Sequence, residues 1–118
     1  MNSCDTYYSL FPHLDALAVM SLCFLVKEGV PRKKDLQWLS QQLEEWKPVG
    51  RRLKIEEARL TAFDNEDKRH SEKIYKMLLH WKRTKGLRAT YKVLHDALCH
   101  QFVNRTDLAQ KLCCQQHK

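Results

Sequence analysis

The sequence predicts an all-α domain from three observations. Its 118 residues include only 3 Gly and 3 Pro, far fewer turn residues than an all-β sandwich or barrel needs. Apolar residues recur with helical spacing in several segments, and no alternating strand pattern, internal repeat or low-complexity tract interrupts them. The hydrophobic fraction of 43% and charged fraction of 30% are those of a globular protein. A chain of this length fits one domain with a buried core.

The N-terminal part holds the most apolar stretch, Leu14–Val26, which is interrupted by Asp15 and Ser21. It is shorter than the ~20 residues that span a bilayer, so we expect a buried helix in front of the bundle. Gly29 and Pro31 would end that helix. The segment also lacks the basic start of a signal peptide. The five cysteines have no paired spacing, so we expect reduced thiols and an intracellular compartment: Cys4, Cys23, Cys99, Cys113 and Cys114.

The next helix is expected to begin at Asp35, an N-capping residue type, and to run to about Glu45. Its apolar stripe is Leu36, Leu39 and Leu43, which recur at helical spacing.

Two short helices are expected to follow. Pro48 suits the first turn of one, with Val49 and Leu53 facing the core. The second is expected over Glu56–Phe63, with Leu60 facing inward.

The strongest helical pattern follows Ser71, a good N-cap, and covers Glu72–Lys85 before Gly86. Its inward stripe is Ile74, Met77, Leu78 and Trp81.

Two further helices complete the chain. The fifth helix of the bundle has the expected stripe Tyr91, Leu94, Leu98 and Phe102. Residues Asn104–Asp107 resemble a capping box and would start a last helix through Leu108 and Leu112.

The three tryptophans have different expected environments. Trp46 and Trp81 fall on inward-facing registers and are expected in the core. Trp38 falls off its helix's leucine stripe. It is therefore expected to pack under the N-terminal helix or to be partly exposed, where it would be a candidate interface anchor.

Four segments in order resemble the death-domain family, and in particular cytosolic adaptor-type death domains. Trp46–Leu53 is similar to the family's tryptophan followed by a short helix, and Ile74–Lys82 to its "ML..W" fourth helix. Ala89–Leu98 is similar to "AT…L..AL", and Asp107–Leu112 to the closing "DLA.KL". The resemblance implies a six-helix antiparallel death-fold bundle, here with the additional N-terminal helix. The expected layout is an extension over residues 1–33, the death domain over 34–114 and a tail over 115–118.

The sequence departs from the family pattern at two places. Gly50 stands inside the second helix where alanine is usual, at a cost of roughly 1 kcal/mol unless a close contact requires it. The connection between helices five and six is also about two residues longer than usual.

Charge indicates an anionic partner. The net charge of +7 divides into −2 over residues 1–31 and +9 over residues 32–118. By resemblance we expect a non-enzymatic module that binds other death-domain proteins, self-associates into helical assemblies and acts in apoptotic or innate-immune signalling. The expected location is the cytoplasm, with the nucleus as an alternative. The candidate protein-binding cations are Arg51, Arg52, Lys54, Arg59, Lys73, Lys76, Lys82, Arg83, Lys85 and Arg88. The acidic counterparts are Glu44, Glu45, Glu56, Glu57, Asp64, Glu66 and Asp67.

Other functions have weaker sequence support. Nucleic-acid binding is the alternative, because the run Lys82–Arg88 is basic, but acids interleave with the bases and no base-reading helix stands out. No catalytic group, cofactor or metal is expected. The glycines are too scattered for a phosphate-binding loop, and His95 with Cys99 supplies only two ligands.

Overall fold

The computed structural model describes residues 26–115, which form six α-helices, one 3-10 turn and no strand. The all-α prediction is confirmed for this part of the chain. The expected N-terminal helix lies outside the described residues except for Val26, which forms an isolated β-bridge with Cys114. The helices are α3 Lys33–Gln42, α4 Lys47–Arg52, α5 Glu57–Glu66, α6 His70–Lys85, α7 Tyr91–Cys99 and α8 Thr106–Cys113, and the 3-10 turn η1 is Gly86–Arg88.

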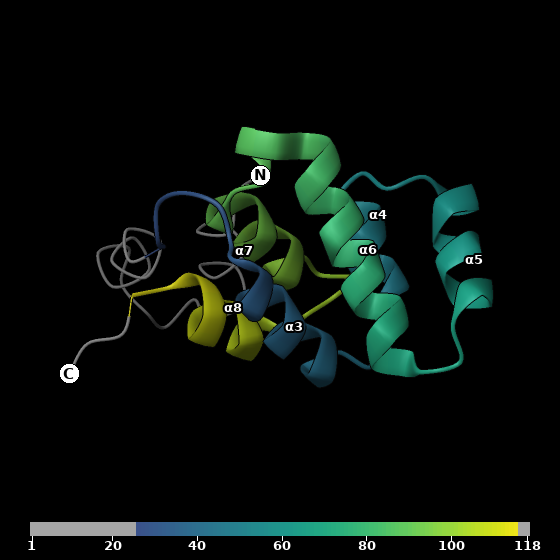
Figure 1. Ribbon diagram of the computed structural model, residues 1–118. Helices are drawn as coiled ribbons and strands as arrows, with labels where there is room; N and C mark the ends of the chain where they lie inside the picture. Colours follow the sequence, from purple (N-terminus) through teal and green to yellow (C-terminus); the bar gives the residue numbers. More distant parts are fainter. Residues whose placement is uncertain (1–25, 116–118) are drawn as a thin grey trace.

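Helix α6 is the central element of the bundle (Figure 1). It packs against α3 and α5, while α3 also contacts α8, and α7 packs against α8. The short α4 contacts both α5 and α7 and so joins the two ends of the bundle. α5 descends and α6 ascends in the view of Figure 1, which places the α4–α5 turn and the end of α6 at the same end of the molecule.

The core consists of the apolar stripes that the sequence predicts. Trp46 and Trp81, which are expected in the core from the sequence, are both buried. Trp38 is partly buried against the same cluster. The fully buried side chains (exposure below 2%) include Leu36, Leu39, Val49, Leu53, Leu60, Ile74, Met77, Leu78, Leu94 and Leu98.

The predicted starts of α3 and α6 are wrong by three and two residues, respectively. α3 begins at Lys33, and Asp35 lies inside its first turn, where its carboxylate accepts the Arg32 N–H at 3.0 Å. α6 begins at His70, one residue before Ser71. At α3 the Asp35 carboxylate satisfies a backbone donor from inside the first turn, and at α6 Asp67, rather than the predicted cap Ser71, accepts the Arg69 N–H at 3.1 Å.

The prediction that Phe102 continues the α7 stripe is wrong. α7 ends at Cys99, and the His100 carbonyl accepts the N–H groups of Val103 and Asn104 at 2.8 and 2.7 Å, which closes a turn. The Phe102 side chain is consequently 67% exposed. The predicted cap Asn104 has φ 54°, and Arg105 occupies the N-cap position of α8 instead.

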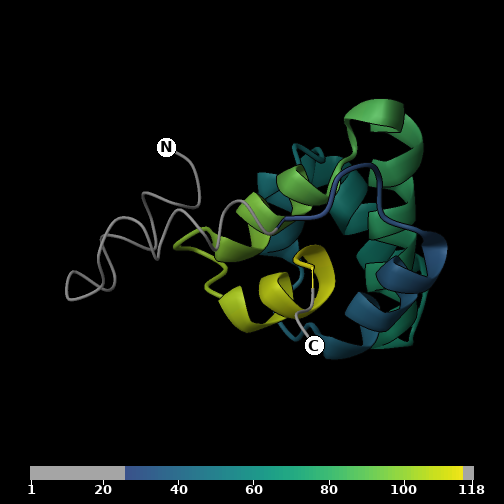
Figure 2. The same ribbon diagram turned by 90° about the vertical axis from the view of Figure 1, so that its left-hand side faces the viewer.

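Residues 26–31 form a strap that crosses from α8 to α3 (Figure 2). The Lys27 N–H donates to the Cys113 carbonyl at 2.7 Å, and the Tyr91 N–H donates to the Gly29 carbonyl at 3.0 Å. Further along, the Tyr91 hydroxyl donates to Asp35 Oδ2 at 2.6 Å and so links α7 to the first turn of α3. The strap therefore ties the last helix, α7 and α3 together through backbone and side-chain bonds.

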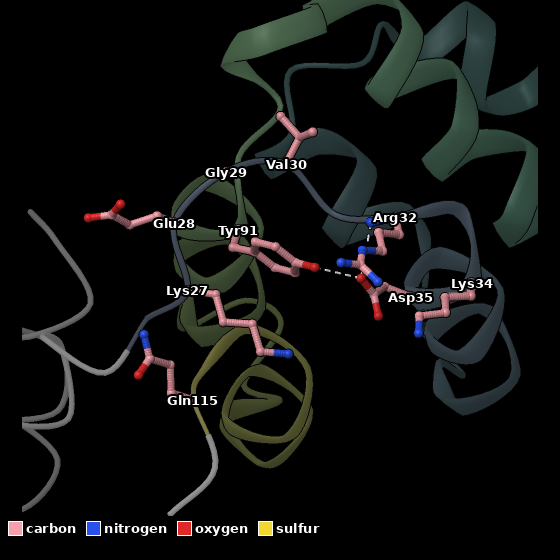
Figure 3. A pocket seen from close by; sticks show the side chains of 9 residues that line it. All are labelled: Lys27, Glu28, Gly29, Val30, Arg32, Lys34, Asp35, Tyr91 and Gln115. Carbon is pink, nitrogen blue, oxygen red and sulfur yellow. Dashed lines mark hydrogen bonds between the residues drawn. The ribbon is translucent and has the colours of Figure 1, made fainter.

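A cavity of about 550 Å³ lies beside this strap, and Figure 3 shows the residues that line it. The Tyr91–Asp35 hydrogen bond crosses the cavity, and the cations Lys27, Arg32 and Lys34 surround it. Lys27 Nζ lies 5.4 Å from the centre of the Tyr91 ring. Burial and the hydrogen bond to Asp35 raise the pKa of Tyr91 to about 12, so the donor is protonated at neutral pH.

Gly50 allows α4 to approach α5 and α6 closely. A Cβ atom at this position would lie 2.5 Å from Leu60 Cδ2 and 2.8 Å from Met77 Sδ. Both neighbours are fully buried, so neither side chain can turn into solvent. The glycine that departs from the family pattern is therefore explained by a close contact between helices.

We predict that Gly50→Ala destabilises the protein although alanine is the better helix former. Overpacking against Leu60 and Met77 should outweigh the gain in helix propensity, leaving a net loss of about 1 kcal/mol in the free energy of unfolding. Urea denaturation monitored by circular dichroism measures this change. Thr61→Ala at an exposed position of α5 is the control and should not destabilise; equal or higher stability for Gly50→Ala would contradict the close contact.

We predict that Tyr91→Phe lowers the free energy of unfolding by about 1–2 kcal/mol at neutral pH, because it removes a partly buried hydrogen bond to a carboxylate. The pKa of Tyr91 is raised in the folded state, so the wild-type advantage is complete below the usual tyrosine pKa of about 10. It should decline as the pH rises toward about 12. Unfolding curves for both proteins across this range test the sign; a difference that grows with pH would contradict it.

Candidate functional site

Four of the ten candidate cations already have partners within the described chain. Lys73 Nζ pairs with Asp64 at 2.8 Å, and Lys76 Nζ pairs with Asp67 at 3.2 Å. Asp64 also binds Lys47 Nζ at 2.7 Å, so one carboxylate joins α4, α5 and α6. These ion pairs hold the helices together and leave the lysines less available to a partner protein.

The other two engaged cations, Arg51 and Lys82, both lie in the last turns of their helices. Arg51 donates from Nε to Glu57, with a second contact of 3.5 Å between Nη2 and the other carboxylate oxygen. This pair raises the pKa of Arg51 and lowers the pKa of Glu57 through their hydrogen bond. Lys82 Nζ donates to the Pro31 carbonyl and so holds the strap to the end of α6.

Three cations come together around a cavity of about 260 Å³ between the α4–α5 turn and the end of α6. Lys54, Arg59 and Lys85 line it together with one carboxylate, Glu56. Lys54 has φ 67°, a left-handed conformation that closes the turn after α4 and leaves the side chain exposed. None of the three cations lies within salt-bridge distance of a carboxylate among the described residues.

Arg52 extends this surface toward the connection between α7 and α8. Its guanidinium lies over the Phe102 ring, 5.7 Å from the ring centre, and Nη1 lies 3.2 Å from His100 Nε2. No described carboxylate pairs with Arg52 either. We call the four cations Arg52, Lys54, Arg59 and Lys85 the basic strip.

The cations of the basic strip contribute to lowering the pKa values of two nearby histidines. Burial and then the charge of Arg59 lower the pKa of His80. Burial, followed by the charges of Arg52 and Lys54, lowers the pKa of His100. Lys54 therefore acts electrostatically on His100 and also lines the cavity beside Arg59. This makes the strip one surface across α4, α5, α6 and the α7–α8 connection.

The remaining candidates, Arg83 and Arg88, are exposed at the end of α6 and in η1 (upper part of Figure 1). Leu87 lies between them in sequence order and is 89% exposed. Neither arginine has a carboxylate partner among the described residues. This turn is a second basic surface next to Lys85, which belongs to the strip.

Sequence reasoning missed three residues of this surface: His80, His100 and Phe102. Phe102 was assigned to the core because it continues the spacing of Leu94 and Leu98. The one available signal was the longer connection before α8, which gives the chain room to turn Phe102 outward.

The described residues show few features of a cofactor or metal site. Among residues 26–115, no three His, Cys, Asp or Glu side chains are grouped closely enough to hold a metal ion. The expected pair His95 and Cys99 does share a face of α7, with Sγ 3.7 Å from Nε2, and both side chains are buried. No helix within the described part is long and apolar enough to cross a membrane.

We predict that Asp64→Asn removes the electrostatic link among α4, α5 and α6. Hydrogen bonds from Lys47 and Lys73 lower the pKa of Asp64 to about 2. The folded-state pKa is depressed, so its stabilisation is complete above the unfolded value of about 3.9 and is lost as the pH falls toward 2. Because the groups are partly exposed, we expect only a small loss of stability at neutral pH.

Thermal unfolding of wild type and Asp64→Asn between acidic and neutral pH measures this effect. The two curves should be furthest apart at neutral pH and should converge at about pH 2. Glu66→Asn, at an exposed residue with no ion-pair partner among residues 26–115, is the matched control. A difference between wild type and Asp64→Asn that persists unchanged at the acidic limit would contradict the ion-pair explanation.

Comparison with known proteins identifies the fold. The family model described as "Death domain" matches residues 33–113, which is more than half of the chain and spans α3 to α8. No curated protein and no solved structure gives a significant match. The buried stripes, the order of the helices and the family match agree, and the chain belongs to the death-domain family.

Proposed function

We propose that this death domain binds acidic surfaces of other death domains, including copies of itself, through the basic strip. As a family, death domains are protein-interaction modules and not enzymes. The observation that carries the proposal is the set of four cations gathered on one surface without carboxylate partners among the described residues. Burying such charges in an interface requires a partner that supplies carboxylates.

At the other end of α6, the same chain carries acidic residues that form no ion pair among residues 26–115. His70 Nε2 lies 3.1 Å from the Leu43 carbonyl, so the exposed residues Glu44 and Glu45 lie near the start of α6. Exposed Glu66 ends α5 at the same end of the bundle (Figure 1). Opposite charges at opposite ends favour head-to-tail contacts, and repeated contacts that do not close into a ring build helical assemblies.

We further propose that the module acts as an adaptor in apoptotic or innate-immune signalling in the cytoplasm. The adaptor-type sequence resemblance supports this assignment. The proposed interaction unit is residues 34–114, with residues 1–33 as an extension and 115–118 as a tail. The Lys27 N–H donates to the Cys113 carbonyl of α8, and the Gly29 carbonyl accepts the Tyr91 N–H of α7, which supports packing of the last part of the extension with the unit.

We predict that Lys54→Glu with Arg59→Glu weakens assembly by at least about tenfold, because the reversed charges would face partner carboxylates. Both residues are exposed, so the helical circular-dichroism signal should be retained. Light scattering at increasing protein concentration measures self-assembly, and capture by a panel of purified death domains measures heterotypic binding. Higher salt should weaken both forms of binding in the wild type.

Lys33→Glu with Lys34→Glu is the matched control, since it changes the net charge equally at exposed positions of α3. This control should assemble and bind like wild type. If the Lys54/Arg59 reversal assembles normally while Arg83→Glu with Arg88→Glu does not, the interface belongs to the α6–η1 turn. Tight binding of a DNA duplex that falls linearly with the logarithm of salt concentration would instead favour the nucleic-acid alternative.

A further inference from the structure

His100 lies between two hydrogen-bond donors, and its neutral ring has only one nitrogen that can accept. The Phe102 N–H donates to His100 Nδ1 at 3.1 Å, and Arg52 Nη1 lies 3.2 Å from His100 Nε2. A neutral imidazole accepts at one nitrogen and donates at the other, whereas a guanidinium only donates. When Nδ1 accepts from Phe102, the proton resides on Nε2 and points toward Arg52. Two donors then face each other at hydrogen-bond distance.

Protonation of His100 does not relieve this conflict. The imidazolium would have donors at both nitrogens, would lose the bond from the Phe102 N–H and would lie against the charge of Arg52. The charged groups that act on His100 are both cations, Arg52 from α4 and Lys54 from the following turn, and with burial they lower its pKa. The free protein therefore keeps His100 neutral at neutral pH, with the two converging donors.

A carboxylate is the chemical group that resolves this arrangement. Its oxygens only accept, and they can receive the Arg52 N–H and the His100 Nε2–H together. Its negative charge is also favoured by Arg52 and the nearby Lys54. The exposed Phe102 ring beside them offers an apolar contact for the methylene groups that carry a glutamate or aspartate carboxylate.

We propose that Arg52 and His100 form a receptor for a single carboxylate side chain of a partner protein, with Phe102 as the adjoining apolar contact. The proposal rests on the proposed function in one respect, because that function supplies an acidic protein as the partner. Arginine beside an exposed aromatic ring is the composition typical of residues that dominate binding energy at interfaces.

The receptor can be tested on the full chain without an identified partner, using acetate as the probe. Nuclear magnetic resonance of the ring nitrogens reports the tautomer of His100, and the Phe102 amide signal reports the adjacent bond. Adding sodium acetate should shift both signals in a saturable way, whereas sodium chloride at equal concentration should not. Equal shifts in the two salts would overturn the proposal.

Two variants separate specific binding from general attraction to a basic protein. Arg52→Gln should weaken acetate binding by about tenfold, the size expected for loss of a charge-assisted hydrogen bond. Arg83→Gln removes the same charge from an exposed position outside the receptor and should bind acetate like wild type. Equal weakening by both variants would show a non-specific effect of net charge and would overturn the proposal.

The pH dependence of acetate binding provides an independent test of the role of His100. A bound carboxylate raises the pKa of His100, so acetate affinity should increase as the pH falls through the pKa of the complex toward the lower pKa of the free protein. His100→Gln retains a donor but cannot titrate in this range, and it should bind acetate without that increase. An unchanged pH profile in His100→Gln would remove His100 from the receptor and overturn the proposal.

Inorganic phosphate distinguishes the nature of the anion. Saturable shifts with phosphate and none with acetate would overturn the carboxylate assignment and favour a phosphate-bearing partner. The result of the acetate titration can also be distinguished from a failure of the proposed function. Acetate binding with normal assembly of the Lys54/Arg59 reversal would keep the receptor and reject the part of the basic strip formed by Lys54 and Arg59, whereas loss of assembly without acetate binding would do the opposite.

Discussion

The close approach of α4 to α5 and α6 positions the surface on which the proposed function depends. Gly50 leaves no room for a side chain between α4 and the buried Leu60 and Met77. Its carbonyl also accepts the Ile55 N–H at 3.0 Å, which closes the turn that places Lys54 in its left-handed conformation. A displacement of α4 would therefore move Arg52 and Lys54 together, away from the cations of α5 and α6. The packing at Gly50 therefore determines where Arg52 and Lys54 lie on the surface.

The cations of this domain divide into those that stabilise the bundle and those that face outward. Asp64 illustrates the first group, because its one carboxylate holds lysines from α4 and α6 at 2.7 and 2.8 Å. The basic strip illustrates the second, since no described carboxylate lies within salt-bridge distance of its members. Exposed ion pairs contribute little to stability, so leaving these cations unpaired costs the fold little and keeps them available for an interface.

The α7–α8 connection brings a histidine and an aromatic ring to the edge of the strip. Its backbone turns at His100, whose carbonyl accepts two N–H groups, and this turn directs Phe102 outward. The arginine of α4 then lies over that ring and beside the imidazole. The α7–α8 connection thus adds groups of a different chemistry to a surface that is otherwise basic.

The sequence by itself determined the helices and the core of this protein, because helical periodicity is a local property. The spacing of Leu36 and Leu39, or of Ile74 and Trp81, identifies a buried stripe without knowledge of what it packs against. The order of the motifs was likewise enough to indicate the family. Cap positions and the outward turn of Phe102 were missed, because they depend on which backbone donors a neighbouring carboxylate or carbonyl satisfies.

Which of the ten candidate cations are paired within the described bundle is visible in the three-dimensional structure alone. Lys73 and Lys85 have similar character in the sequence, yet one binds Asp64 and the other lines an open surface beside Lys54. The difference arises from the packing of α4 and α5 against α6, which sets the distance between charges far apart in the chain. Electrostatic pairing falls off with that distance, and the spacing of residues along the sequence does not contain it.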